Sequence, residues 1–317
     1  MSERITSRFN NRSTALSVVD GIDLGGKRAI VTGGAAGLGY ETSRALARAG
    51  AHLTLAVRNR EQGEAAAARL REENANPNVQ VAPLDLANLP SVAQFARDWG
   101  DAPLHILINN AAIMACPLAR SAQGWESQFA TNHLGHFALT TALLPALRRG
   151  APSRVVALSS SGHKISGVDF DDIHFERREY NKWKAYGQAK SANALMSLGL
   201  WTKEGANGIT ANAVHPGGIM TGLQKHVPLE EMRALGWLKP DDTPLDIFKT
   251  PEQGASTSVW AATAPELTGL GGKYLEDCNE GLPAEPTNRA SGYSPHIMDG
   301  EAAQRLWRVS EEMLGRV

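Results

Sequence analysis

Short apolar segments alternate with helix-like segments along most of the chain, and this alternation is the feature that most constrains its fold. We expect strands at residues 27–32, 52–57, 79–84, 104–109, 154–159, 209–214 and 272–275. Helical periodicity covers residues 40–49, 60–73, 90–99, 124–149, 184–201, 252–262 and 300–314. Strands that alternate with helices form a parallel sheet covered on both faces. The sequence therefore predicts a single-domain α/β protein.

The same pattern divides the chain into three parts. Residues 1–26 precede the first strand, and we expect them to form a partly mobile extension with a short docked helix. Residues 27–276 hold the expected strands and form the main domain, whereas residues 277–317 form a tail that ends in a helix. Two segments of the domain, 162–183 and 218–251, are longer than the fold requires. Loops of that length in compact domains are usually functional.

A glycine-rich turn, Thr32 to Gly39, joins the first expected strand to a helix. Glycines there can supply a bend of unusual dihedral angle, close approach of a pyrophosphate to the main chain, and a helix N-terminus that holds the anion. Gly33, Gly37 and Gly39 are placed to do this, in a Gly-x-x-x-Gly-x-Gly spacing rather than Gly-x-Gly-x-x-Gly. The position of the turn favours a dinucleotide site.

A tyrosine and a lysine, Tyr186 and Lys190, lie four residues apart in an expected long helix, so both project from one face. An ammonium favours the phenolate and lowers the pKa of a nearby tyrosine, which suits proton transfer. The same spacing also occurs in ordinary surface pairs. The other motifs of the chain decide between these interpretations.

The motifs together resemble those of one family, the classical short-chain dehydrogenases/reductases, over about residues 24–276. They are Thr32–Gly39, Asn109–Ala112, Asn132, Ser159–Ser160, Tyr186–Lys190, and Pro216–Gly217 followed by Thr221. The resemblance implies a Rossmann-type doubly wound parallel sheet with helices on both faces. The segment between Ser160 and Tyr186, with residues 21–24 and 272–274, is similar to the retinol dehydrogenase and protochlorophyllide reductase branch. One departure is Ala112, where the family has glycine, and we expect it to shift the cofactor slightly without abolishing binding.

The resemblance also implies roles for individual side chains. Tyr186 is the expected acid/base, Ser160 polarises the substrate oxygen, and Lys190 contacts the ribose and lowers the tyrosine pKa. Hydride transfer leaves a developing alkoxide that needs donors and a proton, which agrees with this set. Asn132 is expected to help hold a relay water, although a helical Asn can also make a local hydrogen bond. A purely structural role is expected for Ser159.

Cofactor choice depends on the end of the second strand, where NAD-preferring members carry an acid that binds the ribose. Here Val57 is followed by Arg58, whose guanidinium suits a phosphate, so we predict NADP(H) over NAD(H), with Arg60 as a helper. Asp85 is expected beside the adenine or as a turn carboxylate. The expected cofactor-binding residues are Gly33, Gly37, Leu38, Gly39, Arg58, Asp85, Leu86, Asn110, Ala111, Tyr186, Lys190, Pro216, Gly217, Ile219 and Thr221.

Composition disfavours several other classes of protein. The net charge of -1 offers no footprint for nucleic acid or an anionic membrane, and we expect neither partner. Cys116 and Cys278 cannot build a disulfide framework, and a reducing cytoplasm fits best. Four histidines near the motifs lack a convincing ligand arrangement, so we expect no metal; they are His133, His136, His163 and His215. A homo-oligomer, dimer or tetramer, is expected.

The implied function is hydride transfer between a nicotinamide cofactor and an alcohol/carbonyl pair. Reduction of a carbon–carbon double bond, or a cofactor-binding regulator without catalysis, remains open. Apolar side chains in the two long loops predict a large lipophilic small-molecule substrate; they are Ile165, Phe170, Phe175, Trp183, Met220, Leu223, Leu229, Met232, Trp237 and Phe248. Those beyond Leu229 equally fit a dimer interface or a satellite core. Glycines and prolines make residues 218–251 a predicted lid over the nicotinamide.

Overall fold

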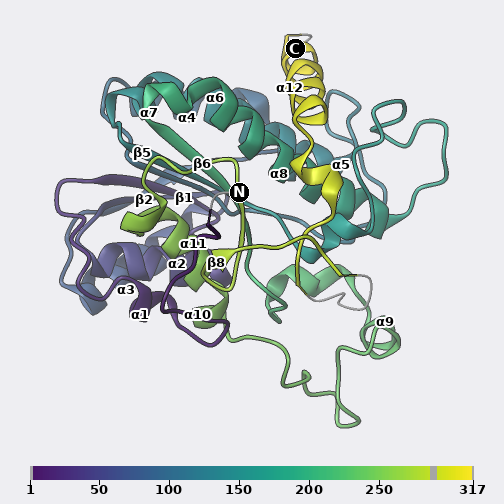
Figure 1. The fold of residues 1–317 in the computed structure, drawn as a ribbon, viewed down its shortest axis with the longest axis horizontal. Helices are drawn as coiled ribbons and strands as arrows, with labels where there is room; N and C mark the ends of the chain where they lie inside the picture. Colours follow the sequence, from purple (N-terminus) through teal and green to yellow (C-terminus); the bar gives the residue numbers. More distant parts are fainter. Residues whose placement is uncertain (1–2, 286–290, 316–317) are drawn as a thin grey trace.

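The computed structural model describes residues 3–285 and 291–315, and its centre is one eight-stranded sheet (Figure 1). The strand order is β3-β2-β1-β4-β5-β6-β7-β8. The parallel strands are β1 (Arg28–Thr32), β2 (His52–Val57), β3 (Val79–Pro83), β4 (Ile106–Asn109), β5 (Ser153–Leu158), β6 (Ile209–His215) and β7 (Tyr274–Glu276). The edge strand β8 (Asn279–Glu280) is antiparallel to β7. The predicted Rossmann-type parallel sheet is confirmed.

Helices cover both faces of the sheet, as Figure 1 shows. One face carries α1 (Ala15–Val18), α2 (Gly37–Arg48), α3 (Arg60–Asn74), α10 (Pro251–Gly254) and α11 (Ser256–Thr263). The other carries α4 (Leu89–Trp99), α6 (Gly135–Ala142), α7 (Leu144–Arg149) and α8 (Lys182–Glu204), with α12 (Gly300–Leu314) packed on α8. Neighbouring residues Ile30 and Val31 are fully buried in the two different cores, because successive strand side chains point to opposite faces.

The single helix predicted at 124–149 is wrong. The segment is divided into α5 (Ser127–Phe129), a π-helical turn η1 (Ala130–Leu134), α6 and α7. The Glu126 carboxylate accepts the N–H groups of Gln128 and Phe129 and so starts the helix later than expected. Pro145 has no N–H to donate, and α7 begins as a new helix with this proline in its first turn. The helix predicted at 252–262 is likewise two helices, α10 and α11.

The N-terminal extension runs beside the last hairpin of the sheet. Ser7 donates from its hydroxyl to the Cys278 carbonyl, and the Ile5 N–H donates to the Glu280 carboxylate. Arg4 donates to the Glu280 carbonyl, so it is bound to the hairpin. The strand β8 that makes these contacts was not predicted, because two residues are too few to give a strand pattern.

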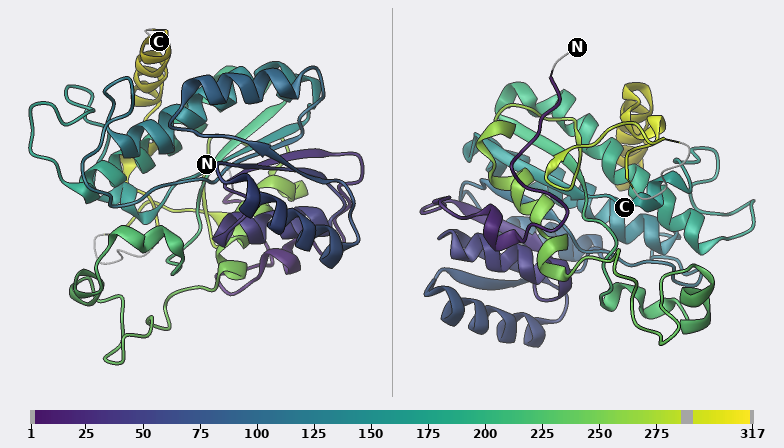
Figure 2. Two further views of the ribbon diagram at one scale, coloured as in Figure 1. Left: turned by 180° about the vertical axis from the view of Figure 1, so that it is seen from behind. Right: turned by 60° about the horizontal axis from the view of Figure 1, so that its bottom comes forward.

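The segment between β6 and α10 extends from the body as an arm, residues 218–250, which both views of Figure 2 show. The arm carries the short helices η4 (Gly222–His226) and α9 (Leu229–Ala234). The other short 3-10 turns are η2 (Ser161–Lys164), η3 (Gly205–Asn207), η5 (Pro265–Leu267) and η6 (Pro295–Met298). Within the part of the chain that the structure describes, no helix is long and apolar enough to cross a membrane.

Candidate active site

A cavity of about 480 Å³ lies at the carboxyl ends of strands β1 to β6, where the strand order reverses and α/β folds bind their ligands. Most of the residues predicted to bind a cofactor line it: Gly33, Gly37, Leu38, Gly39, Arg58, Asp85, Leu86, Asn110, Ala111, Tyr186, Lys190, Pro216 and Thr221. Gly217, Ile219, Ser160 and Asn132 do not line it. Ser160 is half-buried next to the cavity-lining Ser159 and Tyr186, whereas Asn132 is fully buried.

The glycine turn forms one end of the cavity, and its geometry requires glycine. Gly33 has a φ of 64°, in the left-handed region. A Cβ on Gly39 would lie 2.2 Å from the Gly33 carbonyl oxygen, so helix and turn approach too closely for any side chain. The N-cap of α2, Ala36, makes no side-chain capping bond, and the first turn carries no acidic residue. The N–H groups at this helix start are thus suited to an anion.

A hydroxyl on β1 connects this turn to β4. Thr32 Oγ1 accepts the N–H groups of Asn110 (2.9 Å) and Ala111 (3.0 Å), and the Asn110 amide donates to the Thr32 carbonyl (2.8 Å). His136 Nδ1 bonds the Asn132 carbonyl, so Nε2 is left to accept from Thr32 at 2.9 Å. Burial lowers the pKa of His136 to about 4, which keeps the ring neutral. This network holds the β1 and β4 ends together beneath the cavity.

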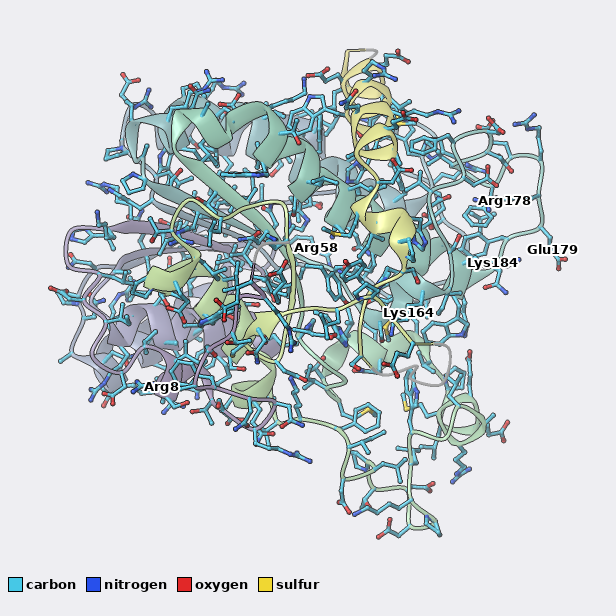
Figure 3. All side chains as sticks on the ribbon, viewed as in Figure 1. Arg8, Arg58, Lys164, Arg178, Glu179 and Lys184 are labelled. Atoms are coloured by element: carbon cyan, nitrogen blue, oxygen red, sulfur yellow. The ribbon has the colours of Figure 1, made fainter. Side chains whose placement is uncertain are left out.

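Polar side chains gather where β2 ends. Arg58 (labelled in Figure 3) is exposed at the cavity wall, and Asn59 and Gln62 line the same part. Arg60, the predicted helper, does not line the cavity and instead pairs with Glu64 at 3.8 Å. Asn59 and Gln62 were not predicted, although their position directly after the strand could have indicated them.

Asp85 is a turn carboxylate, and its place beside an adenine stays a prediction. It lines the cavity after β3. One of its carboxylate oxygens also accepts the Ala87 N–H at 3.0 Å, as a turn carboxylate does.

Tyr186, Lys190 and Ser160 meet at the other end of the cavity. Tyr186 and Lys190 project from α8, and the Lys190 nitrogen lies 5.6 Å from the centre of the tyrosine ring. The Ser160 hydroxyl hydrogen-bonds the Tyr186 phenol and also accepts the Gly162 N–H at 3.1 Å. A Cβ on Gly162 would lie 2.9 Å from the tyrosine ring, so this unpredicted glycine allows the turn to pack against the phenol.

The predicted lowering of the tyrosine pKa by lysine is not found. Burial raises the pKa of Tyr186 to about 12, and the Ser160 hydrogen bond lowers it only in part. Burial also lowers the pKa of Lys190 to about 7, because its ammonium loses water, and the side chain donates to the Leu158 carbonyl at 2.9 Å. A lysine that is partly neutral exerts little field on the phenol. Tyr186 is therefore fully protonated at neutral pH.

Asn132 lies in the π-helical turn η1 and is fully buried. Its side-chain oxygen accepts the Ile113 N–H at 2.9 Å, and its amide donates to the Ile113 carbonyl at 2.8 Å. The side chain thus clamps the β4 loop that lines the cavity. A π turn inside an α-helix frees backbone groups and is frequent at functional sites.

Apolar side chains surround Tyr186 on the side away from the glycine turn. The cluster contains Met114, Ala115, Trp183, Tyr186, Leu223, Val227, Met232 and Trp237. Four of these were predicted, but Met114 and Ala115 come from the loop after β4, where no sequence pattern marked them. Phe170 packs instead in the core under α12, and Phe175 makes an edge-to-face contact with Tyr180. Ile165 and Leu229 are about half exposed, at 50% and 47%.

The loop after β6 connects this apolar wall to the glycine turn. A Cβ on Gly37 would lie 3.6 Å from the Thr221 methyl group. Gly217 has a φ of 97°, and its Cα lies under the Lys249 side chain, where a Cβ would approach within 2.7 Å. Lys249 is buried and pairs with Asp277 at 2.5 Å. This pair anchors the base of the arm beside the sheet.

The fold and the cavity define a class, the nicotinamide-dependent oxidoreductases with a doubly wound sheet. The family model for short chain dehydrogenase matches residues 27–232. The chain is 46% identical over 297 residues to a Streptomyces antibioticus protein named "Probable oxidoreductase", covering 92% of this chain and 99% of that protein. It is 39% identical over 299 residues to retinol dehydrogenase 13 of Homo sapiens, covering 92% and 85% respectively.

Solved structures agree. A crystal structure of an uncharacterized protein from Mycobacterium paratuberculosis superposes with a TM-score of 0.72 at 33% identity, covering 95% of this chain and 97% of that chain. The RhlG/NADP active-site complex of Pseudomonas aeruginosa gives 0.62 at 26% identity, covering 80% and 95%. This chain belongs to the short-chain dehydrogenase/reductase family, in its retinol dehydrogenase-like branch. Its general chemistry is NAD(P)-dependent oxidoreduction.

Proposed function

We propose that this protein transfers a hydride between NADP(H) and the alcohol/carbonyl pair of a lipophilic small molecule, with Tyr186 as the general acid/base. The observation that carries the proposal is the single cavity that has the glycine turn at one end and the hydrogen-bonded Tyr186–Ser160 pair at the other. One cavity can then hold a dinucleotide with its reactive end beside the proton donor.

The cavity residues fit a dinucleotide. The uncapped start of α2 and the close approach at Gly39 suit a diphosphate. Arg58 suits a ribose phosphate, because a guanidinium binds phosphate in a bidentate manner, and Asn59 and Gln62 add polar groups beside it. The RhlG structure carries NADP in its name, which supports the same choice. A higher kcat/KM with NAD(H) than with NADP(H) would contradict this part of the proposal.

The bound nicotinamide supplies or accepts the hydride. In the direction of reduction, the Tyr186 phenol donates its proton to the substrate oxygen, and its raised pKa keeps that proton in place at neutral pH. The Ser160 hydroxyl polarises the same oxygen. Lys190, on the cavity wall, would contact the ribose of the cofactor and return a proton to the phenol, and Asn132 holds the loop around them.

The apolar cluster around Tyr186 supports a lipophilic substrate, since Met114, Trp183 and Trp237 would meet its non-reacting part. A relative named retinol dehydrogenase supports the same class. We further propose that the arm, residues 218–250, is a lid that closes over the nicotinamide. Its first part carries Thr221, which lies beside the glycine turn, and Val227, which belongs to the apolar cluster around Tyr186. The proposed oligomer, a dimer or tetramer, is measurable by light scattering.

Turnover of a panel of lipophilic aldehydes, ring ketones and enones tests the function, with retinal as one aldehyde. Tyr186→Phe should bind NADPH normally and lower kcat for the carbonyl substrates at least about a hundredfold, the lower limit of general acid/base catalysis. Tyr180→Phe is the matched control, because this half-buried phenol bonds the Cys116 carbonyl and the Glu126 carboxylate and does not line the cavity.

Three outcomes would contradict the proposal. Retained turnover in Tyr186→Phe would place the acid elsewhere. Turnover of enones alone would favour a carbon–carbon double-bond reductase. NADPH binding without any turnover would favour a regulator.

A further inference from the structure

The C-terminal segment after β8 returns to the turn that carries Ser160. Lys164, labelled in Figure 3, donates to the Ser291 carbonyl, and the Ser294 N–H donates to His163 Nε2 at 3.0 Å. His296 Nε2 lies 3.1 Å from the hydroxyl of Ser191 on α8. Residues 291–296 thus contact both elements that carry the proposed catalytic groups, the Ser160 turn and α8.

His163 is the link between this segment and Ser160. Its ring is fully buried, and Nδ1 lies 2.6 Å from the Ser160 carbonyl oxygen. A backbone N–H such as that of Ser294 can only donate, so Nε2 carries the lone pair and Nδ1 carries the hydrogen. Burial lowers the pKa of His163 to about 4, so the ring keeps this single neutral form at neutral pH.

The Ser160 carbonyl accepts a second bond from the same residue, the His163 N–H at 3.1 Å. On the other side of Ser160, its hydroxyl accepts the Gly162 N–H and bonds the Tyr186 phenol. These bonds fix both the peptide plane and the hydroxyl of one residue. Loss of the ring bond would free the plane, and a small shift of the hydroxyl is costly for catalysis.

We propose that His163 is a positioning residue that orients Ser160 toward the substrate oxygen by coupling its carbonyl to Ser294 of the C-terminal segment. The inference rests on the proposed function, in which Ser160 polarises that oxygen. It gives the chain after β8 a role in the active site, which the extended tail predicted from sequence did not have.

Two substitutions separate the two bonds of the ring. His163→Asn places an amide nitrogen near the position of Nδ1. It therefore keeps the hydrogen bond to the Ser160 carbonyl and loses the one from the Ser294 N–H. His163→Gln places an amide oxygen near the position of Nε2 and keeps only the Ser294 bond. We expect kcat for the fastest carbonyl substrate of the panel to fall about tenfold or more in His163→Gln and only a few-fold in His163→Asn. The Kd for NADPH should change less than about twofold in both variants.

A proline substitution removes the partner from the other side. Ser294 has φ -80° and ψ 138°, which proline adopts, so Ser294→Pro deletes the N–H without backbone strain. Ser294→Ala keeps the N–H and is the matched control. We expect Ser294→Pro to lower kcat a few-fold at unchanged NADPH Kd, and Ser294→Ala to match the wild type.

A double-mutant cycle decides whether His163 acts through Ser160. In a Ser160→Ala background, His163→Gln should lower kcat less than about twofold further, because the group it orients is gone. A full additional loss there, or an unchanged kcat in His163→Gln alone, would overturn the inference. An unchanged kcat in Ser160→Ala itself would instead overturn the proposed function of Ser160.

Discussion

The two ends of the cavity differ in whether main chain or side chains form them. The glycine-turn end is formed by main chain and by glycines that follow β1 directly. The packing is so close that a Cβ added to Gly39 would lie 2.2 Å from the Gly33 carbonyl oxygen. The Tyr186 end depends on side chains from segments far apart in the chain, since Ser160 follows a strand and Tyr186 belongs to a helix. Behind Ser160, His163 bonds the main chain of Ser294 in the C-terminal segment. The first end depends on local conformation, whereas the second depends on long-range hydrogen bonds.

This difference has a consequence for mutation. At the glycine-turn end only the smallest side chain fits, so even an added methyl group is damaging. At the Tyr186 end the polar atoms of the side chains matter as well, so exchange of a hydrogen-bond donor or acceptor is damaging even where the volume is kept. Five experiments test this contrast.

Gly39→Ala should have the largest effect. Its methyl group would overlap the Gly33 carbonyl, and relief of such an overlap costs on the order of 1–3 kcal/mol, which is about five- to more than a hundredfold in the NADPH Kd. Gly222→Ala, also at the cavity, is the control, because its Cβ would meet nothing within 4 Å. Fluorescence titration with NADPH measures both. Equal NADPH affinities in the two variants would refute the claim that close main-chain packing at Gly39 is needed for cofactor binding.

Arg58→Ala tests whether side chains also contribute at the cofactor end. Loss of a charged hydrogen bond to phosphate should reduce the preference for NADPH over NADH by about tenfold, measured as the ratio of kcat/KM values. Arg60→Ala is the control, because Arg60 pairs with Glu64 outside the cavity. If the ratio falls in Arg60→Ala and not in Arg58→Ala, the assignment of the phosphate site is wrong.

Acid should lower the free energy of unfolding through the buried histidines near the Tyr186 end. His133 bonds Ser310 of α12, and burial lowers the pKa of His133 to about 3 and that of His163 to about 4, from 6.5. The unfolded chain therefore binds more protons below pH 6.5, so the stability present above that pH is lost as the pH falls toward 4. Protonation of each histidine on unfolding should lower the free energy of unfolding by on the order of 1–2 kcal/mol between pH 7 and pH 5.

Glu126 and Glu276 oppose this trend, because burial raises their pKa values and favours their protonated forms in the fold. Urea unfolding at pH 7.5, 6 and 5 measures the net effect. The His163→Gln variant should show a shallower decrease than the wild type. Identical pH profiles for the two proteins would contradict a buried neutral His163.

The smallest effect is expected at the lid. Glu231 of α9 accepts from Trp183 Nε1 at 2.8 Å and pairs with Lys182, so it connects the arm to the start of α8. Glu231→Gln should raise KM for the carbonyl substrate about threefold with little change in kcat, as for a partly exposed ion pair. Glu230→Gln, on the same exposed turn, is the control.

Hydrogen exchange measures the lid directly. We expect residues 218–250 to become more protected with NADPH and a substrate-like ketone. Equal protection with and without these ligands would refute lid closure.

Much of the site was predictable from short motifs. Gly33, Arg58 and Lys190 were located correctly on the cavity wall, because each follows a strand or lies at a fixed helical spacing. The π turn at Asn132 was not predictable, because hydrogen-bond slippage inside a helix leaves the apolar periodicity almost unchanged. The raised pKa of Tyr186 was also missed, since the depth of burial depends on the packed fold rather than on the spacing to Lys190.

The order of strands and helices, the parallel sheet and the glycine turn could be predicted from the sequence, because they follow from periodicity and glycine conformation over a few residues. The three-dimensional packing was needed to show that Met114 joins Trp237 around Tyr186, and that Ser294 reaches His163 behind Ser160. Such contacts join residues more than a hundred positions apart in the chain, and no local pattern specifies which distant segments pack together, because chain folding and packing of the whole domain select them.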